Sequence, residues 1–337
     1  SSFVGGGGDY AFRIRVDLDS DNNVYLCGEI ESTDFPAAGG FNSELKGQRD
    51  AFVMKIDSTG SSVIWTSILG GSNYDAAWDI ELDDLDNVYL TGLTRSIDFP
   101  AGGGMGDSFR GYEDGFLTKI NADGASISWS MFLGGSDADG CKELFVDAGR
   151  NSYVACLSRS DYAPIVGGFQ PAFAGGMWDA YIVKVNAAGS AVLWSTYLGG
   201  GSNEAAVAIA VDSGDNVYVT GSTQSSDFPI VGGFDGTHDG IFPDVFLTKI
   251  NAAGDAIVYS TFYGEDGGTD QGRCVEVDAS GNAYVGGLTN SAGLQIVGGF
   301  DNTLDGSMDT FVLKVNPAGD GIVWSSYLGG LDTGGQE

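Results

Sequence analysis

The chain has 337 residues, and its 46 acidic side chains against 15 lysines and arginines give a formal net charge of −31. Nucleic acid is excluded as a partner, because its phosphates would meet a surface of the same charge. A hydrophobic content of 42% is compatible with a folded chain, and 55 glycines favour short strands joined by tight turns. No apolar run approaches the length that spans a bilayer.

A unit of about 65 residues repeats along the whole chain. Its clearest marker is Leu-Gly-Gly at residues 69–71, 133–135, 198–200 and 328–330, with Tyr-Gly-Glu at 263–265 as the degenerate copy. The copies span approximately residues 3–67, 68–131, 132–196, 197–261 and 262–326, and residues 327–337 begin a further copy.

Each copy contains four short apolar stretches in a fixed order, which in the fourth copy are residues 208–211, 217–221, 245–250 and 257–262. We name them strands one to four. An Asp-x-x-x-Asn turn joins strands one and two, and in the first copy Asp17 with Asn22 shows one extra residue.

Both faces of these strands are largely apolar, so the predicted sheets need cover on both sides. The sequence therefore predicts an all-β fold, a β-propeller of five four-stranded blades that closes as a single domain over residues 1–337. An open β-solenoid is the alternative, and it would leave its ends uncapped.

Four motifs carry a resemblance to a known family. They are Val-Asp-x-x-x-Asn-x-Tyr-Val-Thr-Gly, Ser-x-Asp-Phe-Pro, Asp-x-Phe-x-x-Lys-Ile and Trp-Ser-Thr-Tyr-Leu-Gly-Gly. The pattern resembles the SBBP-type β-propeller repeat of secreted and surface proteins of bacteria and archaea. The resemblance implies a propeller fold and export, and it brings no catalytic residues. The five copies depart from the seven blades to which the family name refers.

An acidic residue precedes the turn aspartate by eight positions in every copy. With strand one innermost, as the resemblance implies, these acids would ring the mouth of the central channel. Such a ring could hold a hard cation such as Ca²⁺; the alternative is that each acid accepts hydrogen bonds from its own glycine-rich loop. The five acids are Asp9, Asp75, Asp139, Glu204 and Asp270.

Asp17, Asp19 and Asp21 form a second candidate calcium site. Their alternate spacing matches a calcium loop, but the glycine and the distal glutamate of the EF-hand are missing. The site prediction therefore rests on the spacing alone.

Residues that break the repeat are candidates for ligand binding, because a blade does not require them. Trp78 and Trp178 have no aromatic counterparts in the other copies, and they either stack on sugar rings or fill local gaps. His238, the single histidine, either binds a metal or lies in a solvated loop.

Other residues recur in each copy and are expected to serve the blade. The lysines that end strand three are predicted to form an ion pair or a hydrogen bond with the turns, and the aspartates that open strand three are predicted to cap backbone donors. Strand four carries an aromatic residue for blade packing. The lysines are Lys55, Lys119, Lys184, Lys249 and Lys314; the aspartates are Asp50, Asp114, Asp179, Asp244 and Asp309; the aromatics are Trp65, Trp129, Trp194, Tyr259 and Trp324.

The four cysteines form no Cys-x-x-Cys pair, which argues against a structural zinc site. Cys141 and Cys156 flank one predicted hairpin and could form a disulfide, whereas buried free thiols are the default expectation for all four. Residues 1–6 repeat the pattern of residues 325–330. This overlap fits a closed ring, a piece of a longer array, or a segment that pairs with a neighbouring subunit.

These features predict a non-catalytic, exported surface or matrix protein that contacts other proteins or copies of itself. A carbohydrate-binding propeller is the alternative, and a carboxylate-based glycosidase or lyase ranks third because no acid pair stands out. No cofactor is required by the sequence, although Ca²⁺ fits its acidic sites. An extracellular or cell-surface location follows from the family resemblance.

Overall fold

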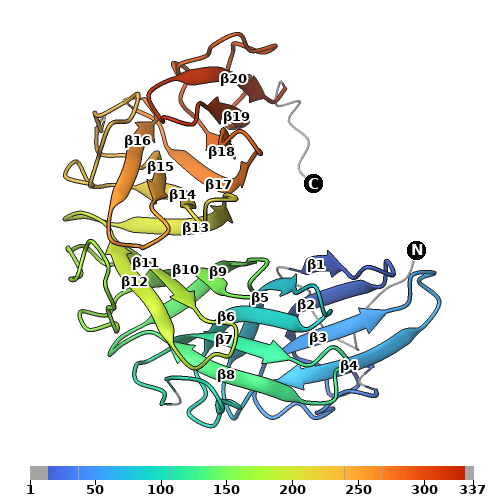
Figure 1. Cartoon of the computed structure of the whole chain (residues 1–337). Helices are drawn as coiled ribbons and strands as arrows, with labels where there is room; N and C mark the ends of the chain where they lie inside the picture. Colours follow the sequence, from blue (N-terminus) through green and yellow to red (C-terminus); the bar gives the residue numbers. More distant parts are fainter. Residues whose placement is uncertain (1–13, 37, 107, 239, 266, 331–337) are drawn as a thin grey trace. The chain divides into compact units, whose positions relative to one another are not determined.

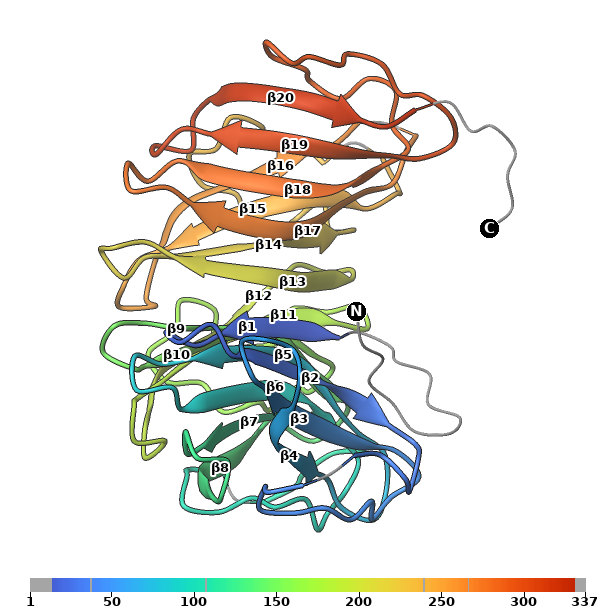
Figure 2. The same cartoon turned by 90° about the vertical axis from the view of Figure 1, so that its right-hand side faces the viewer.

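A computed structural model describes residues 14–330 apart from residues 37, 107, 239 and 266 (Figure 1). Within these residues the chain forms twenty strands, and they make five four-stranded sheets. In each sheet the strands lie side by side in chain order, as the last sheet shows well in Figure 2. No helix of this part of the chain is long and apolar enough to cross a membrane. The predicted all-β fold with five four-stranded blades is confirmed.

The strands of the five sheets have nearly uniform lengths. The first sheet contains β1 (Arg15–Leu18), β2 (Val24–Ile30), β3 (Asp50–Ile56) and β4 (Val63–Leu69), and the second β5 (Asp75–Leu82), β6 (Val88–Thr94), β7 (Asp114–Ile120) and β8 (Ile127–Leu133). The third contains β9 (Asp139–Val146), β10 (Ser152–Ser158), β11 (Asp179–Val185) and β12 (Val192–Leu198). The fourth contains β13 (Glu204–Val211), β14 (Val217–Thr223), β15 (Asp244–Ile250) and β16 (Ile257–Tyr263), and the fifth β17 (Asp270–Val277), β18 (Ala283–Thr289), β19 (Asp309–Val315) and β20 (Ile322–Leu328).

The chain divides into two compact units. One consists of Ser1–Pro164 with Val183–Leu193, and the other of Ile165–Ile182 with Trp194–Glu337. The first two sheets belong to the first unit and the last two sheets to the second, while the third sheet contributes strands to both. The single closed domain over residues 1–337 stays a prediction.

Face-to-face packing of consecutive sheets builds the core of each unit. Every residue of β6 and β7 is buried, which explains why both faces of these strands are apolar. Between the sheets, an aromatic residue of strand four covers the glycine of the next turn between strands three and four. A Cβ atom built on Gly124 would lie 2.4 Å from Trp65 Cδ2, and one on Gly254 would lie 2.2 Å from Trp194 Cδ2. The predicted role in blade packing is therefore confirmed for Trp65, Trp129, Trp194 and Tyr259, each of which lies against such a glycine.

The turn between strands one and two is organised by its first aspartate. Asp83 Oδ1 accepts hydrogen bonds from the backbone N–H groups of Leu85 at 3.0 Å and Asn87 at 2.9 Å. Lys119 Nζ lies 2.9 Å from Asp83 Oδ2 and donates to Tyr89 Oη at 2.6 Å. The expected ion pair at the end of strand three is therefore present. The same pairs are Lys55 with Asp19, Lys249 with Asp212 and Lys314 with Asp278.

In the first copy this turn uses Asp19 and Asn23, so the predicted pairing of Asp17 with Asn22 was wrong. Asp19 Oδ1 accepts from the backbone N–H of Asn23 at 2.8 Å, with the same spacing of four as Asp83 and Asn87. Asp17 lies two residues earlier on β1, and its Oδ2 accepts from the backbone N–H of Leu82 at 2.9 Å. The turn therefore contains no extra residue.

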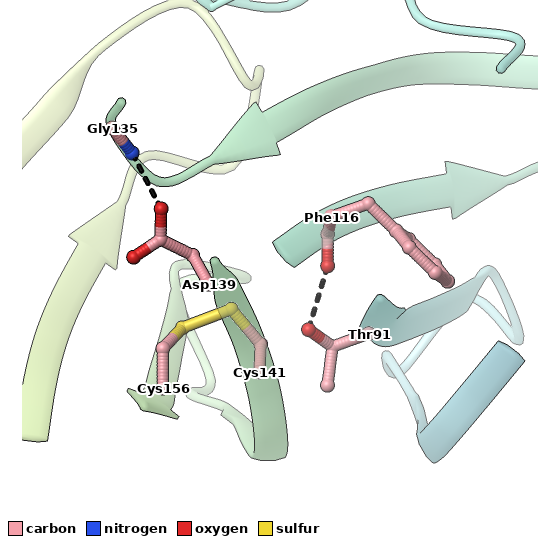
Figure 3. The surroundings of a disulfide bond; sticks show 6 residues. All are labelled: Thr91, Phe116, Gly135, Asp139, Cys141 and Cys156. Carbon is pink, nitrogen blue, oxygen red and sulfur yellow. Dashed lines mark hydrogen bonds between the residues drawn. A yellow bond between two sulfur atoms is a disulfide. The ribbon is translucent and has the colours of Figure 1, made fainter. Parts of the chain in front are cut away.

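A disulfide joins Cys141 of β9 to Cys156 of β10, where a register shift places the two residues opposite each other (Figure 3). Both cysteines are fully buried. The default expectation of free thiols is therefore wrong for this pair. Cys27 is a buried free thiol and Cys274 an exposed one.

Candidate functional site

Four of the predicted ring acids open the first strand of their sheets and are at most 1% exposed: Asp75, Asp139, Glu204 and Asp270. Each carboxylate accepts a hydrogen bond from a backbone N–H of its own loop, as in the 2.7 Å bond from Gly135 to Asp139 (Figure 3). The others are Gly71 to Asp75, Gly200 to Glu204 and Glu265 to Asp270. Asp9 lies outside the described residues.

A side-chain hydroxyl group donates a further hydrogen bond to each of these carboxylates. Ser96 Oγ donates to Asp75 at 2.8 Å, and Thr223 Oγ1 donates to Glu204 at 2.6 Å. The described residues contain no group of three or more His, Cys, Asp or Glu side chains that could hold a metal ion. The four described acids therefore accept hydrogen bonds within their own loops, and the axial cation site stays a prediction.

The two glycines of the Leu-Gly-Gly marker make room for neighbouring acidic groups. A Cβ atom on Gly199 would lie 2.6 Å from Asp179 Oδ1, and one on Gly71 would lie 2.5 Å from Asp98 Oδ1. Asp98 belongs to the Ser-x-Asp-Phe-Pro motif and accepts from the backbone N–H of Ser72 at 2.8 Å. The Leu-Gly-Gly marker and the Ser-x-Asp-Phe-Pro motif therefore recur together, because the aspartate of the motif binds the backbone of the loop that follows the marker.

The candidate calcium loop in the first copy does not gather its three acids. Asp19 is the turn aspartate, while Asp17 bonds to Leu82 and Asp21 is exposed. Burial raises the pKa of Asp19, but hydrogen bonds from Asn23 and Lys55 outweigh this effect and hold the pKa at about 2. Asp19 is therefore an ionised partner of Lys55.

Trp78 is half-buried at a bulge in β5 and is covered by neighbouring groups. Lys142 Nζ lies 3.4 Å from the centre of its ring, and a Cβ on Gly140 would lie 2.9 Å from Trp78 Cζ3. The environment matches the gap-filling alternative more closely than an open platform for sugars.

Trp178 and His238 lie in separate loops of the second unit and are half-buried. The backbone oxygen of Trp178 accepts from the N–H of Glu204 at 2.7 Å. The Nε2 atom of His238 lies 3.3 Å from the backbone oxygen of Thr223, and its ring packs edge-on against Phe262 with ring centres 5.6 Å apart.

A cluster that sequence reasoning missed lies on the loops of the first two sheets. We call Arg49, Tyr74, Arg95 and Tyr112 the Arg–Tyr cluster. Arg49 and Arg95 lie 5.5 and 5.4 Å from the ring centre of Tyr74, and Arg95 lies 5.0 Å from that of Tyr112. Tyr74 stands where the other copies have Ala138, Asn203 and Thr269, so the break in the repeat was the available signal.

Glutamates hold the cluster in place. Tyr74 Oη donates to Glu29 Oε2 at 2.5 Å, Arg49 Nη1 to Glu29 Oε1 at 3.0 Å, and Arg95 Nε to Glu113 Oε2 at 2.9 Å. Burial and the hydrogen bond to Glu29 raise the pKa of Tyr74 to about 12, so the phenol stays neutral. The rings and guanidinium groups are therefore pre-organised.

The cluster is accessible from solvent. Tyr112 is 66% exposed, and the side chain of Arg95 is 41% exposed. A surface pocket of about 380 Å³ lies beside it, lined by Glu31, Gln48, Arg49 and Tyr74. Within the described part of the chain, Arg95 uses only Nε in hydrogen bonds, so its two terminal nitrogens can bind a carboxylate in a bidentate manner.

Comparison with solved structures supports the fold. The chain has a TM-score of 0.50 and 9% identity to a mutant of the NanB sialidase from Streptococcus pneumoniae, with 96% of this chain and 62% of that chain covered. A quinohemoprotein alcohol dehydrogenase from Pseudomonas putida matches with a TM-score of 0.41 and 10% identity over 95% of this chain and 59% of that chain. A gluconolactonase from Xanthomonas campestris matches with a TM-score of 0.35 and 11% identity over 96% of this chain and 87% of that chain. At these identities the sialidase supports the fold alone, and the two lower scores carry no argument.

No curated protein matches the sequence. The family model of the SBBP β-propeller repeat matches residues 193–229, which run from β12 through β14 and its following loop. This segment contains one Leu-Gly-Gly marker, one Asp-x-x-x-Asn turn and one Ser-x-Asp-Phe-Pro motif. The match confirms the resemblance over these residues, which fit the model of an SBBP β-propeller repeat.

Proposed function

We propose that the chain is a non-catalytic, exported propeller that makes protein contacts through the Arg–Tyr cluster, with a second copy of itself as the partner. The cluster is the observation that carries this proposal. Tyrosine and arginine are enriched at protein interfaces, where rigid side chains lose little entropy on binding. Here Arg49 and Tyr74 have no counterparts of their kind in the other copies. Glutamates fix the cluster, and the outer edge of Arg95 stays open.

The charge of the molecule indicates what would bind there. Arg95 presents free N–H donors, and the chain itself carries 46 acidic side chains. An aspartate-rich loop of a second copy therefore offers the bidentate partner that a guanidinium group prefers. Each copy carries a net charge of −31, so salt screens both the repulsion between copies and the contact of Arg95, and association is therefore compared at a fixed ionic strength.

Two features support export and absence of catalysis. The buried Cys141–Cys156 disulfide suits an oxidising compartment. The repeated acids and lysines take part in hydrogen bonds and ion pairs within their sheets, as Asp83 and Lys119 do, and are thereby occupied in structural roles. The carbohydrate-binding alternative has less support, because Lys142 lies over the ring of Trp78.

Sedimentation velocity of the full chain at several concentrations tests the proposal. We expect the average mass of the wild type to rise with concentration at 0.15 M salt, and the rise to be lost in Arg95→Ala. Tyr162→Ala is the matched control, because Tyr162 is 80% exposed and lies outside the cluster. The proposal would be contradicted if the mass of the wild type did not change with concentration, or if Arg95→Ala and Tyr162→Ala associated equally. If the wild type bound a neutral glycan array and Tyr74→Ala did not, the carbohydrate-binding alternative would be favoured.

A further inference from the structure

Two acidic side chains meet at the boundary between consecutive sheets. One opens strand three of a sheet, and the other opens strand one of the next. In three such pairs both side chains are at most 1% exposed, and the pKa of the aspartate that opens strand three is raised. The pairs are Asp50 with Asp75, Asp114 with Asp139, and Asp179 with Glu204.

The pair of Asp179 and Glu204 shows the geometry most directly. A Cβ atom on Gly199 would lie 2.6 Å from Asp179 Oδ1 and 2.7 Å from Glu204 Oε2, so both carboxyl groups converge on one point. Asp179 Oδ2 accepts a hydrogen bond from the backbone N–H of Ala174 at 2.7 Å. Asp179 Oδ1 is buried and has no hydrogen-bond donor among the described residues.

The surroundings contain little positive charge to compensate two carboxylates. The ionisable neighbours are Asp227 beside Asp179, Asp137 and Arg110 beside the second pair, and Asp98 and Lys46 beside the first. All five are exposed to solvent. Two buried carboxylates in contact cannot both be ionised without a large electrostatic cost.

We propose that Asp179 and Glu204 share one proton, and that this proton stabilises the contact between the loops that lead into β11 and β13. The proton resides on Asp179 Oδ1, which then donates to Glu204 Oε2. A protonated carboxyl group thereby gives the unpaired oxygen a partner, and the pair carries one negative charge. This inference is independent of the proposed protein contact.

The pKa values agree with this arrangement. Burial, with the charge of Glu204, raises the pKa of Asp179 to about 7. Burial, with the charge of Asp139, raises that of Asp114 to about 7, and burial with the charge of Asp75 raises that of Asp50 to about 6. An aspartate of the unfolded chain titrates near pH 4, so the folded state binds more protons between about pH 4 and 7. The pair of Asp179 and Glu204 therefore stabilises the fold at acidic pH and loses this contribution as pH rises through that window.

Thermal unfolding between pH 4.5 and 8.5 in EDTA tests the proposal. We compare the wild type with Asp179→Asn, which keeps a hydrogen-bond donor but cannot titrate, and with Glu44→Gln on an exposed side chain as control. We expect the melting temperature of the wild type to fall by several degrees over this range. The melting temperature of Asp179→Asn should fall less steeply with pH, and that of Glu44→Gln should fall as steeply as that of the wild type. Equal slopes in all three proteins would overturn the proposal.

Two further measurements distinguish a shared proton from a bound cation. Infrared spectroscopy of the wild type at pH 6 is expected to show the band of protonated carboxyl groups. The amplitude of this band should be lower in Asp179→Asn, whether or not the variant is as stable as the wild type. Absence of the band would overturn the proposal. Calcium at pH 8 is expected to act no differently from sodium at matched ionic strength. A calcium-specific recovery that Asp179→Asn abolishes would show instead that the pair binds a divalent cation.

Discussion

The indole ring of Trp129 lies on Gly189, the glycine of the turn between β11 and β12. A Cβ atom on Gly189 would lie 2.4 Å from Trp129 Cδ2, and the indole Nε1 donates to the backbone oxygen of Ala187 at 3.4 Å. The backbone φ of Gly189 is +65°, a conformation that side chains disfavour. The turn glycine is therefore required both by its conformation and by the ring that covers it.

Gly124→Ala is predicted to destabilise the fold more than Gly60→Ala. Both glycines have the same backbone conformation, with φ of +68° and +69°, but only Gly124 lies under a ring, that of Trp65. Gly60→Ala should cost about 1 kcal/mol for its conformation, and Gly124→Ala about 1 to 2 kcal/mol more for the overlap. Chemical denaturation of the two variants checks the difference.

Reduction of the disulfide is predicted to lower stability without abolishing the sheet. Cys141 and Cys156 are 15 residues apart, and closing a loop of this length stabilises a fold by about 3 kcal/mol in the chain-entropy model. Denaturant unfolding of Cys141→Ala/Cys156→Ala should show this loss. Reducing agent should lower the stability of the wild type but not that of the double variant, and an equal response of both would contradict the assignment.

Removal of a buried lysine should cost far more than removal of an exposed arginine. Lys119→Met leaves the Asp83 carboxylate buried without its cation, and we expect a loss of about 3 kcal/mol. Arg150→Ala breaks an ion pair with Asp84 in which both side chains are exposed, and no measurable loss is expected. Equal stability of the two variants in urea titrations would show that the buried pair has no structural role.

The repeat made the sheets predictable, because the same four apolar stretches and turn residues recur in each copy. The turn of the first copy was harder, since Asp17, Asp19, Asn22 and Asn23 allow two pairings and only the backbone path selects Asp19 with Asn23. The disulfide depends on a register shift at Cys156, which periodicity does not reveal.

The Arg–Tyr cluster and the carboxyl pairs were missed for a related reason. Tyr74 contacts Arg49 from the preceding copy and Arg95 from its own, and Asp179 meets Glu204 across a sheet boundary. An alignment of copies compares equivalent positions, whereas these contacts join positions that are not equivalent. Only the packing of consecutive sheets brings them together.

The central claim is that the repeated lysines and aspartates hold the sheets, whereas the Arg–Tyr cluster around the unrepeated Tyr74 makes contacts with a partner. Melting temperature and sedimentation velocity, measured on the same samples of Lys119→Met and Arg95→Ala, test it most directly. We predict that Lys119→Met melts at a lower temperature but, while folded, associates as the wild type does, and that Arg95→Ala melts as the wild type does but stays monomeric. Loss of association in Lys119→Met with normal association in Arg95→Ala would contradict the claim.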